Sequence, residues 1–294
     1  MTGILIIDKP ENMTSFGVVA AVRRICSEKK CGHSGTLDPM ATGVMTVLLG
    51  GATRFCELLP SHDKAYTAGF RLGTVTDTLD ITGKVLEQRQ VNASARQVMD
   101  AMAGFIGEIE QLPPMYSAVS VNGQRLYELA RKGIEAERPS RRVNIYSVDF
   151  AGCNEESGEY LINVECSSGT YIRTLIADIG EKLGCGAVLT SLRRTSANGF
   201  GIRQAVTLDQ LRADGGEAHI IPVEEALAAY PQVNVSAAQE TRFLNGGELF
   251  TQRLSCLKMN GLYRVFGPAN GFIGVGEIDG SECMKVRRVY KKSE

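Results

Sequence analysis

Hydrophobic and polar positions follow two different periods along this chain, and together they predict a mixture of strands and helices. Residues 66–72 alternate between apolar side chains and polar or small ones, which is typical of a half-buried strand. The apolar stretches 4–7, 143–150 and 160–166 are predicted strands as well, the last two joined by a turn at 155–158. Elsewhere apolar residues recur every three or four positions, and capping signals place helices at 15–25, 95–105 and 172–183.

The texture of the sequence changes twice. Residues 111–142 are rich in proline, glycine and charge, which predicts a long insertion with one short helix at 126–132. After Pro231, a short helix at 237–244 precedes short strands separated by glycine turns. We interpret 231–294 as a separate small β-barrel of roughly 60 residues, near the minimum for an independent core, and 1–230 as the larger domain.

Composition indicates an ordinary soluble globular protein. The chain has 294 residues, 44% of them hydrophobic, and its first ten residues lack the basic and long apolar regions of a signal peptide. No apolar run is long enough to span a bilayer, so we expect a cytoplasmic protein. Eight scattered cysteines and three distant histidines predict neither a zinc site nor a disulfide framework, and the cysteines are expected to be small buried hydrophobes.

Charge is distributed unevenly. A net charge of −1 argues by itself against a nucleic-acid-binding protein. The cations, however, gather in five clusters, whereas acids concentrate elsewhere. Any one cluster is ordinary surface charge, but the five together favour a polyanionic partner. They lie at 23–30, 131–132, 138–142 and 193–194 and near the C-terminus, at 285–292.

Residues 31–44 carry the most distinctive chemistry. This glycine-rich segment holds one imidazole, His33, and one carboxylate, Asp38, directly before Pro39. Proline disfavours the helical conformation of the residue before it, so Asp38 is expected on a loop. The apolar run 44–49 that follows is expected to be core. Taken alone, the segment is either a plain turn or a loop that presents a catalytic carboxylate.

The segment from Gly32 to Gly43 resembles the catalytic motif of the bacterial tRNA pseudouridine-55 synthases, the TruB family. Four further blocks are similar in order and spacing: 9–15, 64–80, 169–174 and 192–194. The C-terminal part resembles a PUA domain, an RNA-binding barrel. The resemblance implies an α+β fold, with a pseudouridine-synthase core of mixed or antiparallel sheet flanked by helices, and a small PUA-like barrel. One departure is Asn12, where the family commonly has glycine; asparagine tolerates positive φ.

The resemblance also implies a reaction. The family isomerises uridine to pseudouridine at position 55 in the T-loop of tRNA, without cofactor or metal, after flipping the base. Asp38 is then the nucleophile, attacking either C1′ of the sugar or C6 of the base. Arg173 is expected to pair with Asp38 through a bidentate guanidinium rather than to be a surface charge. Tyr66 is expected to stack on the base and to help move the C5 proton; its alternative is a core aromatic.

Further residues are implied to bind the substrate. His33 would fill the space of the extracted nucleotide or support the loop, and Leu192 would close the pocket unless it is simply core. Lys9 and Tyr171 belong to two of the family blocks. The insertion 111–142 would clamp the RNA with its basic residues, Arg131, Lys132, Arg141 and Arg142, and the barrel would hold the acceptor-stem side of the tRNA.

Three other functions stay open on the sequence. A guide-dependent rRNA pseudouridine synthase shares the chemistry but needs protein partners and lacks an insertion like 111–142, which favours a stand-alone enzyme. A non-catalytic chaperone could fold tRNA through the same surface without Asp38. An aspartate-based hydrolase would instead release free base. We expect tRNA, bound through its T-arm, to be the partner of a monomer that needs no protein partner and no membrane.

Overall fold

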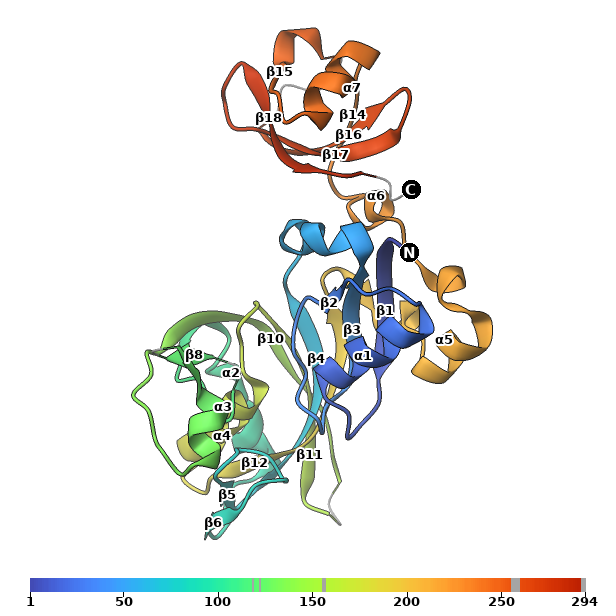
Figure 1. The fold of residues 1–294 in the computed structure, drawn as a ribbon. Coiled ribbons are helices and arrows are strands. Elements are labelled where there is room, and N and C mark those ends of the chain that lie inside the picture. The colour runs from blue at the N-terminus through green and yellow to red at the C-terminus, as the bar shows by residue number, and fades with distance from the viewer. Residues whose placement is uncertain (118, 122, 155–156, 255–259, 292–294) are drawn as a thin grey trace.

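The computed structural model describes residues 1–117, 119–121, 123–154, 157–254 and 260–291, and these form two large sheets and two small two-stranded ones (Figure 1). The larger sheet runs in the order β1-β3-β12-β4-β11-β10-β7, with β2 paired to β3 and β13 to β12. Only β12 and β3 pair in parallel among these neighbours; the rest are antiparallel. The expected α+β class with a mixed sheet is confirmed. The strands are β1 (Gly3–Lys9), β2 (Cys31–His33), β3 (Thr42–Leu49), β4 (Lys64–Leu72), β7 (Gly107–Gln111), β10 (Arg141–Asn154), β11 (Glu159–Cys166), β12 (Ala187–Ala197) and β13 (Phe200–Gly201).

The predicted helices form where their caps and apolar stripes place them. In α1 (Ser15–Ile25), the Thr14 side chain accepts a hydrogen bond from the Gly17 backbone. In α2 (Ala95–Ala103), Ser94 and Gln97 form the expected capping box. Helices α2 and α4 (Ile172–Lys182) pack on β4 and on β10 to β12, whereas α1 packs with α5 (Leu208–Asp214) on β1 and β3. Two apolar cores therefore lie against different parts of one sheet.

Strand β12 is the most central of the elements that the periodicity did not predict. It lies in the middle of the sheet, between β3 and β4. Two consecutive arginines, Arg193 and Arg194, interrupt its apolar alternation, and Arg194 is only 1% exposed. A buried arginine gives the appearance of a polar, loop-like stretch. The predicted strands at 143–150 and 160–166 are longer in the structure, and of the turn predicted between them residues 155–156 lie outside the described residues.

The insertion is short of regular structure. It holds the hairpin β8 (Ser120–Val121) and β9 (Gln124–Arg125) and the helix α3 (Leu126–Arg131), beside α2 and α4 in Figure 1. A second small hairpin, β5 (Thr74–Thr76) and β6 (Val85–Gln88), follows β4. None of the described helices combines the length and apolarity that crossing a bilayer needs.

The C-terminal residues form a curled five-stranded sheet at one end of the molecule (Figure 1), in the order β14-β16-β17-β18-β15. Its strands are β14 (Gln232–Asn234), β15 (Leu249–Phe250), β16 (Gly261–Gly267), β17 (Gly271–Ile278) and β18 (Cys283–Val289). Helix α7 (Ala237–Leu244) packs on it, with Phe243 in its core. Between the two large sheets lie the 3-10 segment η1 (Gly50–Leu58) and the short helix α6 (Val223–Ala226) (Figure 1).

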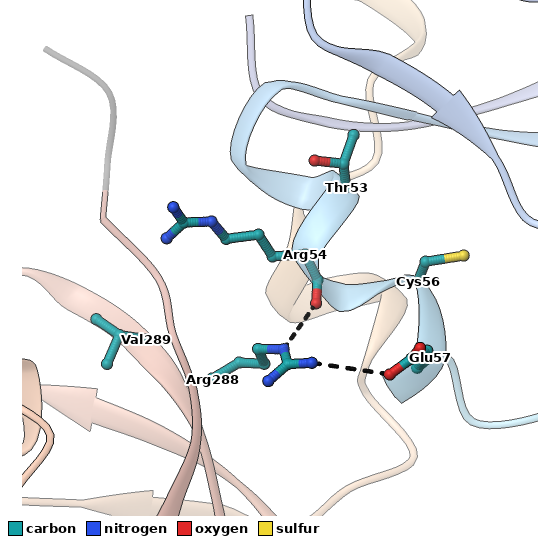
Figure 2. Close-up of a pocket in the computed structure, with 6 residues that line it drawn as sticks. All are labelled: Thr53, Arg54, Cys56, Glu57, Arg288 and Val289. Carbon is teal, nitrogen blue, oxygen red and sulfur yellow. Dashed lines mark hydrogen bonds and ion pairs between the residues drawn. The ribbon is translucent and has the colours of Figure 1, made fainter.

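Aromatic packing and one arginine join η1 to this C-terminal sheet. The ring centroid of Phe55 lies 6.1 Å from that of Phe272 and 6.0 Å from that of Tyr290. Arg288 of β18 donates to the Arg54 carbonyl at 3.1 Å and lies 3.7 Å from the Glu57 carboxylate (Figure 2). A cavity of about 460 Å³ lies beside these contacts. Because apolar rings are buried between η1 and the C-terminal sheet, the two sheets are joined by packed side chains and not by a bare linker.

Candidate active site

The loop that carries Asp38, residues 34–41 between β2 and β3, is held by hydrogen bonds along its length. The Ser15 hydroxyl accepts from the Leu37 N–H at 2.8 Å and donates to the Leu37 carbonyl at 2.9 Å. The Lys9 ammonium, 0% exposed, donates to the Pro39 carbonyl at 3.1 Å. The Ser34 hydroxyl bonds Asn198. Since few of its polar groups are left free to move, the loop holds Asp38 in a fixed position.

Arg194 supports the same loop from beneath. Its Nε donates to the Val44 carbonyl at 2.6 Å, Nη1 to the Thr36 carbonyl at 3.4 Å and Nη2 to the Gly35 carbonyl at 3.2 Å. The close approach of β3 to β12 requires Gly43, which has φ +102° and where a Cβ would lie 2.2 Å from the Arg194 carbonyl oxygen. No such restriction applies at Gly32, where a Cβ would meet nothing within 4 Å. Of these two glycines, only the later one is imposed by geometry.

Asp38 and Arg173 form an ion pair. Arg173, on the first turn of α4 and 4% exposed, places its Nε 3.0 Å from Oδ2 of Asp38. Nη1 donates to the Thr78 carbonyl at 2.9 Å and Nη2 to the Tyr116 carbonyl at 2.8 Å. The expected pairing is present, but it is made through one nitrogen and not through a bidentate fork, because the other nitrogens hold backbone carbonyls.

A second carboxylate lies on the far side of Arg173. Oδ2 of Asp80 is 3.7 Å from Nη1, and its side chain is 7% exposed. Asp80 is held in turn by the Thr78 hydroxyl at 2.8 Å and the Thr82 N–H at 3.0 Å. Between them Leu79 adopts φ +64°, a conformation that a branched apolar residue rarely takes. This local strain accompanies the geometry that presents both the Thr78 carbonyl and Asp80 to Arg173.

Asp38 opens on a cavity of about 330 Å³. Tyr66 of β4 and Leu192 of β12 line it with apolar surface and are 6% and 8% exposed. Lys64, Gly169, Tyr171 and Arg173 line it as well, together with Thr36, Leu37, Ser117, Val119, Thr170 and Ile172. A partly buried carboxylate beside an aromatic ring and an arginine in such a cavity can act as a nucleophile toward a planar ligand.

Burial shifts the pKa values of the groups in the site. It raises the pKa of Asp38 above its ordinary value, while the neighbouring charges of Arg173 and Lys9 act in the opposite direction and Asp80 reinforces the rise. Burial raises the pKa of Tyr66 to about 12, so its phenol is protonated at neutral pH. Burial also lowers the pKa of Lys9 to about 8. Burial therefore favours the protonated form of Asp38, whereas the nearby cations favour its ionised form.

The other predicted site residues lie at different distances from the cavity. Tyr171 directly precedes α4. The side-chain amide of the fully buried Gln111 accepts from the Tyr171 N–H at 2.9 Å and donates to the Tyr171 carbonyl at 3.3 Å. Arg141 lies over the Tyr171 ring, 4.5 Å from its centroid. His33 lies on β2 outside the cavity lining, and its Nδ1 is buried without a partner in the structure. The remaining three predicted residues do not line the cavity: Arg131, Lys132 and Arg142.

Comparison with known proteins places this site in a family. Residues 23–172 match the family model described as TruB family pseudouridylate synthase, N-terminal domain. The chain is 45% identical over 277 residues to tRNA pseudouridine synthase B from Clostridium kluyveri, covering 94% of this chain and 95% of that protein. The chain belongs to the TruB family.

Other TruB-family matches extend to the rest of the chain. Residues 173–228 and 231–290 match two C-terminal models, tRNA pseudouridylate synthase B C-terminal domain and Pseudouridine synthase II TruB, C-terminal. The Escherichia coli O1:K1 tRNA pseudouridine synthase B is 41% identical, covering 98% of this chain and 95% of that protein. Among solved structures, a chain of a Cbf5-Nop10-Gar1 complex matches with a TM-score of 0.74 at 26% identity, covering 98% of this chain and 84% of that chain. The PUA-like C-terminal fold is consistent with these matches.

Several residues that shape this TruB-family site were not proposed from the sequence as site residues. Asp80 and Lys64 stood within family blocks, but no spacing rule connects Asp80 to Arg173, 93 positions away, or Lys64 to the loop. Ser15 lies in the family block 9–15 and in the predicted cap of the first helix, but neither pattern indicates that its hydroxyl bonds Leu37. Gln111 carries no local signal, and the family block and charge cluster that contain Arg194 do not indicate its partners, since both residues act on backbone groups distant in sequence.

Proposed function

We propose that this chain isomerises uridine to pseudouridine at position 55 in the T-loop of tRNA. The observation that carries the proposal is the Asp38 carboxylate, 3.0 Å from a buried guanidinium of Arg173 and facing a cavity lined by Tyr66. The 45% and 41% identical relatives are named tRNA pseudouridine synthase B. The cavity suits a base that has left the RNA stack, since it joins apolar walls to one reactive carboxylate.

In the proposed reaction, an Asp38 oxygen forms a bond either to C1′ of the ribose or to C6 of the uracil. The N1–C1′ bond breaks, the base turns within the cavity, and C5 bonds to C1′. The C5 proton leaves, N1 gains a proton and the bond to Asp38 breaks, so that atoms and electrons balance without a redox partner. Arg173 keeps the carboxylate ionised and oriented. We assign Tyr66 to stacking, because a phenol with a pKa of about 12 is a poor base at neutral pH.

The remaining residues are assigned by position. Tyr171 and Leu192 line the cavity and would enclose the base. Lys9 is buried and donates to the carbonyls of Pro10 and of Pro39 in the Asp38 loop, so we assign it to support of the loop and not to direct contact with RNA. His33 would occupy the space left by the extracted nucleotide, since its imidazole has an unpaired nitrogen.

The proposed RNA surface extends beyond the cavity. Residues 1–230 would carry catalysis, the insertion 111–142 would close over the T-arm, and residues 231–294 would hold the acceptor-stem side. Arg131, Lys132 and Arg142 are exposed on or next to the insertion, where phosphates could reach them. We propose a monomer that acts in the cytoplasm, on tRNA, without a protein partner.

A guide-dependent enzyme is the second candidate, because the chain resembles a protein solved as part of a Cbf5-Nop10-Gar1 complex. The insertion 111–142 and the identity of more than 40% to proteins named for tRNA favour the stand-alone reading. The test uses purified protein and an unmodified tRNA transcript alone. The proposal expects one pseudouridine, at position 55. Conversion that needs added proteins or a guide RNA would contradict it, as would release of free uracil.

A further inference from the structure

Two cations at the cavity have neither a carboxylate nor a carbonyl partner among the described residues, whereas Arg173 pairs with Asp38 and both Lys9 and Arg194 donate to backbone carbonyls. Lys64, the first residue of β4, lines the cavity, and Arg141, the first residue of β10, lies beside two cavity residues, Gly169 and Tyr171. Within the described residues neither lies within 4.0 Å of an acidic group, whereas Arg142 pairs with Glu108 at 3.6 Å. Unpaired cations next to a substrate cavity suggest that the missing anion comes from the ligand.

Arg141 presents an unused pair of donors. Its guanidinium stacks on the Tyr171 ring at 4.5 Å, and its Nη1 faces Gly169, where a Cβ would lie 3.2 Å away. Nε and Nη2, which share the opposite edge, are both buried and have no hydrogen-bond partner in the part of the chain that the structure describes. Leaving two buried donors unpaired is costly, and this edge of a guanidinium matches two oxygens of a phosphate. The stack on Tyr171 fixes the plane of the fork in advance.

Lys64 brings a second charge to the same place. Its side chain passes over the nucleophile loop, with Cε and Nζ 3.6 and 4.0 Å from the position of a Cβ on Gly35. Burial lowers the pKa of Lys64, and the positive charges of Arg194 and Arg141 lower it further. The nearby carboxylate of Asp63 accepts from the Tyr146 hydroxyl at 3.0 Å and is exposed. An anion beside Lys64 and Arg141 would relieve this like-charge repulsion.

We propose that Lys64 and Arg141 form a phosphate subsite for the phosphodiester that flanks the nucleotide in the cavity. The inference rests on the proposed function, since it takes the ligand to be RNA. A base beside Asp38 lies in the cavity that Lys64, Gly169 and Tyr171 line, so its own backbone phosphate reaches the rim where the two cations lie. The subsite would hold the backbone while the base is out of the stack, and its contribution would be independent of base identity.

The test pairs protein variants with RNAs that lack one charge. Three T-arm hairpins carry a neutral methylphosphonate linkage on the 5′ side of the target uridine, on its 3′ side, or in the distal stem. For the wild-type protein, we expect one flanking linkage to raise Kd about tenfold, as for loss of a charge-assisted hydrogen bond. Arg141→Gln and Lys64→Met should bind the unmodified hairpin more weakly and lose little more with that linkage. Losses that simply add, for both flanking linkages, would overturn the proposal.

Two controls separate the subsite from general effects. Arg212 lies on α5, a helix far from the cavity residues in sequence that packs against β1, and it pairs with Asp209. Arg212→Gln removes this cation and should keep the full tenfold effect of the neutral linkage. Arg141→Lys keeps the charge but loses the two-donor edge of the guanidinium, so we expect a response to the neutral linkage between those of the wild type and Arg141→Gln. This variant serves as the test if Arg141→Gln folds poorly. The salt dependence of Kd should fall by about 0.7 in log–log slope for Arg141→Gln, as for one single-strand phosphate contact.

The two proposals fail differently. Binding and the linkage effect need no turnover, so a wild-type protein that binds the hairpin without forming pseudouridine would refute the proposed function and leave the subsite to be decided by the linkage data. A protein that forms pseudouridine while Arg141→Gln and Lys64→Met respond to the neutral linkage as fully as Arg212→Gln would refute only the subsite. A wild-type protein that does not bind the hairpin would refute both.

Discussion

Substitution of Ser15 by alanine tests whether the fixed position of Asp38 matters for the reaction. Ser15 is 4% exposed, and its hydroxyl bonds both the N–H and the carbonyl of Leu37, the residue before Asp38. Alanine leaves the Leu37 N–H and carbonyl without partners. An unpaired buried polar group costs about 1–3 kcal/mol, so we expect a loss of about 2 kcal/mol in the free energy of unfolding.

The reaction should suffer more than the fold. A loop no longer fixed at Leu37 lets the carboxylate of Asp38 leave its aligned position, and a shift of about 1 Å can cost a hundredfold in rate. We expect the single-turnover rate of tritium release from C5-labelled tRNA, at saturating enzyme, to fall roughly ten- to a hundredfold. The Kd for tRNA should change little, since the RNA-binding surface is untouched.

Ser236→Ala is the matched control. Ser236 is an exposed serine that caps α7, accepting from the Gln239 N–H, and the loss of such a cap costs about 1 kcal/mol. Ser236→Ala removes a serine hydroxyl that bonds a backbone N–H, but one that is exposed and not in contact with the Asp38 loop, so it should leave the rate near that of the wild type. If Ser15→Ala slows tritium release no more than Ser236→Ala does, the loop contacts are structural only and the reasoning is refuted.

Three further predictions follow from the contacts around the same loop. Gly43→Ala should lower the free energy of unfolding by about 2–5 kcal/mol in urea titrations, because a Cβ at this positive φ would meet the Arg194 backbone. The control is Gly32→Ala, where a Cβ would meet nothing within 4 Å, and it should change the free energy of unfolding by less than about 0.5 kcal/mol. Equal effects of the two substitutions would contradict the prediction. Lys9 has a folded-state pKa of about 8, below the ordinary 10.5, so between these pH values the unfolded chain binds more protons than the folded one, and the free energy of unfolding should rise from pH 8 to 10.5 by up to about 3 kcal/mol. Lys9→Met should lack this rise, so the difference in stability between the wild type and the variant should change with pH by that amount. A difference that stays constant over this pH range would refute the assignment. Arg173→Lys keeps the charge but loses donors to the Thr78 and Tyr116 carbonyls, so kcat should fall at least tenfold with tRNA binding retained; a rate within twofold of wild type would show that charge alone suffices.

Local patterns in the sequence were enough for most of the elements. The period of two at 66–72 and the capping signals at Thr14 and Ser94 act within a few residues, and β4, α1 and α2 form there. Asn12 has φ +60°, as its place in the family's glycine position requires. The missed strand β12 shows the limit, because Arg194 is a charged residue whose burial is decided by carbonyls contributed by the loop 34–44.

The site was predictable only in part for the same reason. Asp38, Tyr66 and Arg173 share recognisable motifs, and the structure brings all three to one cavity. The expectation that the cysteines are buried fails for Cys153, because nearly all of the last six residues of β10 are exposed; Cys31, Cys56 and Cys283 are only partly buried, and Cys256 lies outside the described residues. Arg173 contacts Asp38 through one nitrogen because its other nitrogens bond the carbonyls of Thr78 and Tyr116. No pattern in the sequence predicts the strained turn at Leu79 that directs the Thr78 carbonyl toward Arg173.

The most direct test of the account is tritium release by Asp38→Asn. Asparagine is close in size to aspartate but cannot act as an anionic nucleophile, and the loop contacts of Ser15 and Lys9 do not involve the carboxylate. The account predicts that the variant binds tRNA with a Kd near that of the wild type and releases no C5 tritium above background. Release at a rate comparable to the wild type would contradict the assignment of Asp38 as the nucleophile.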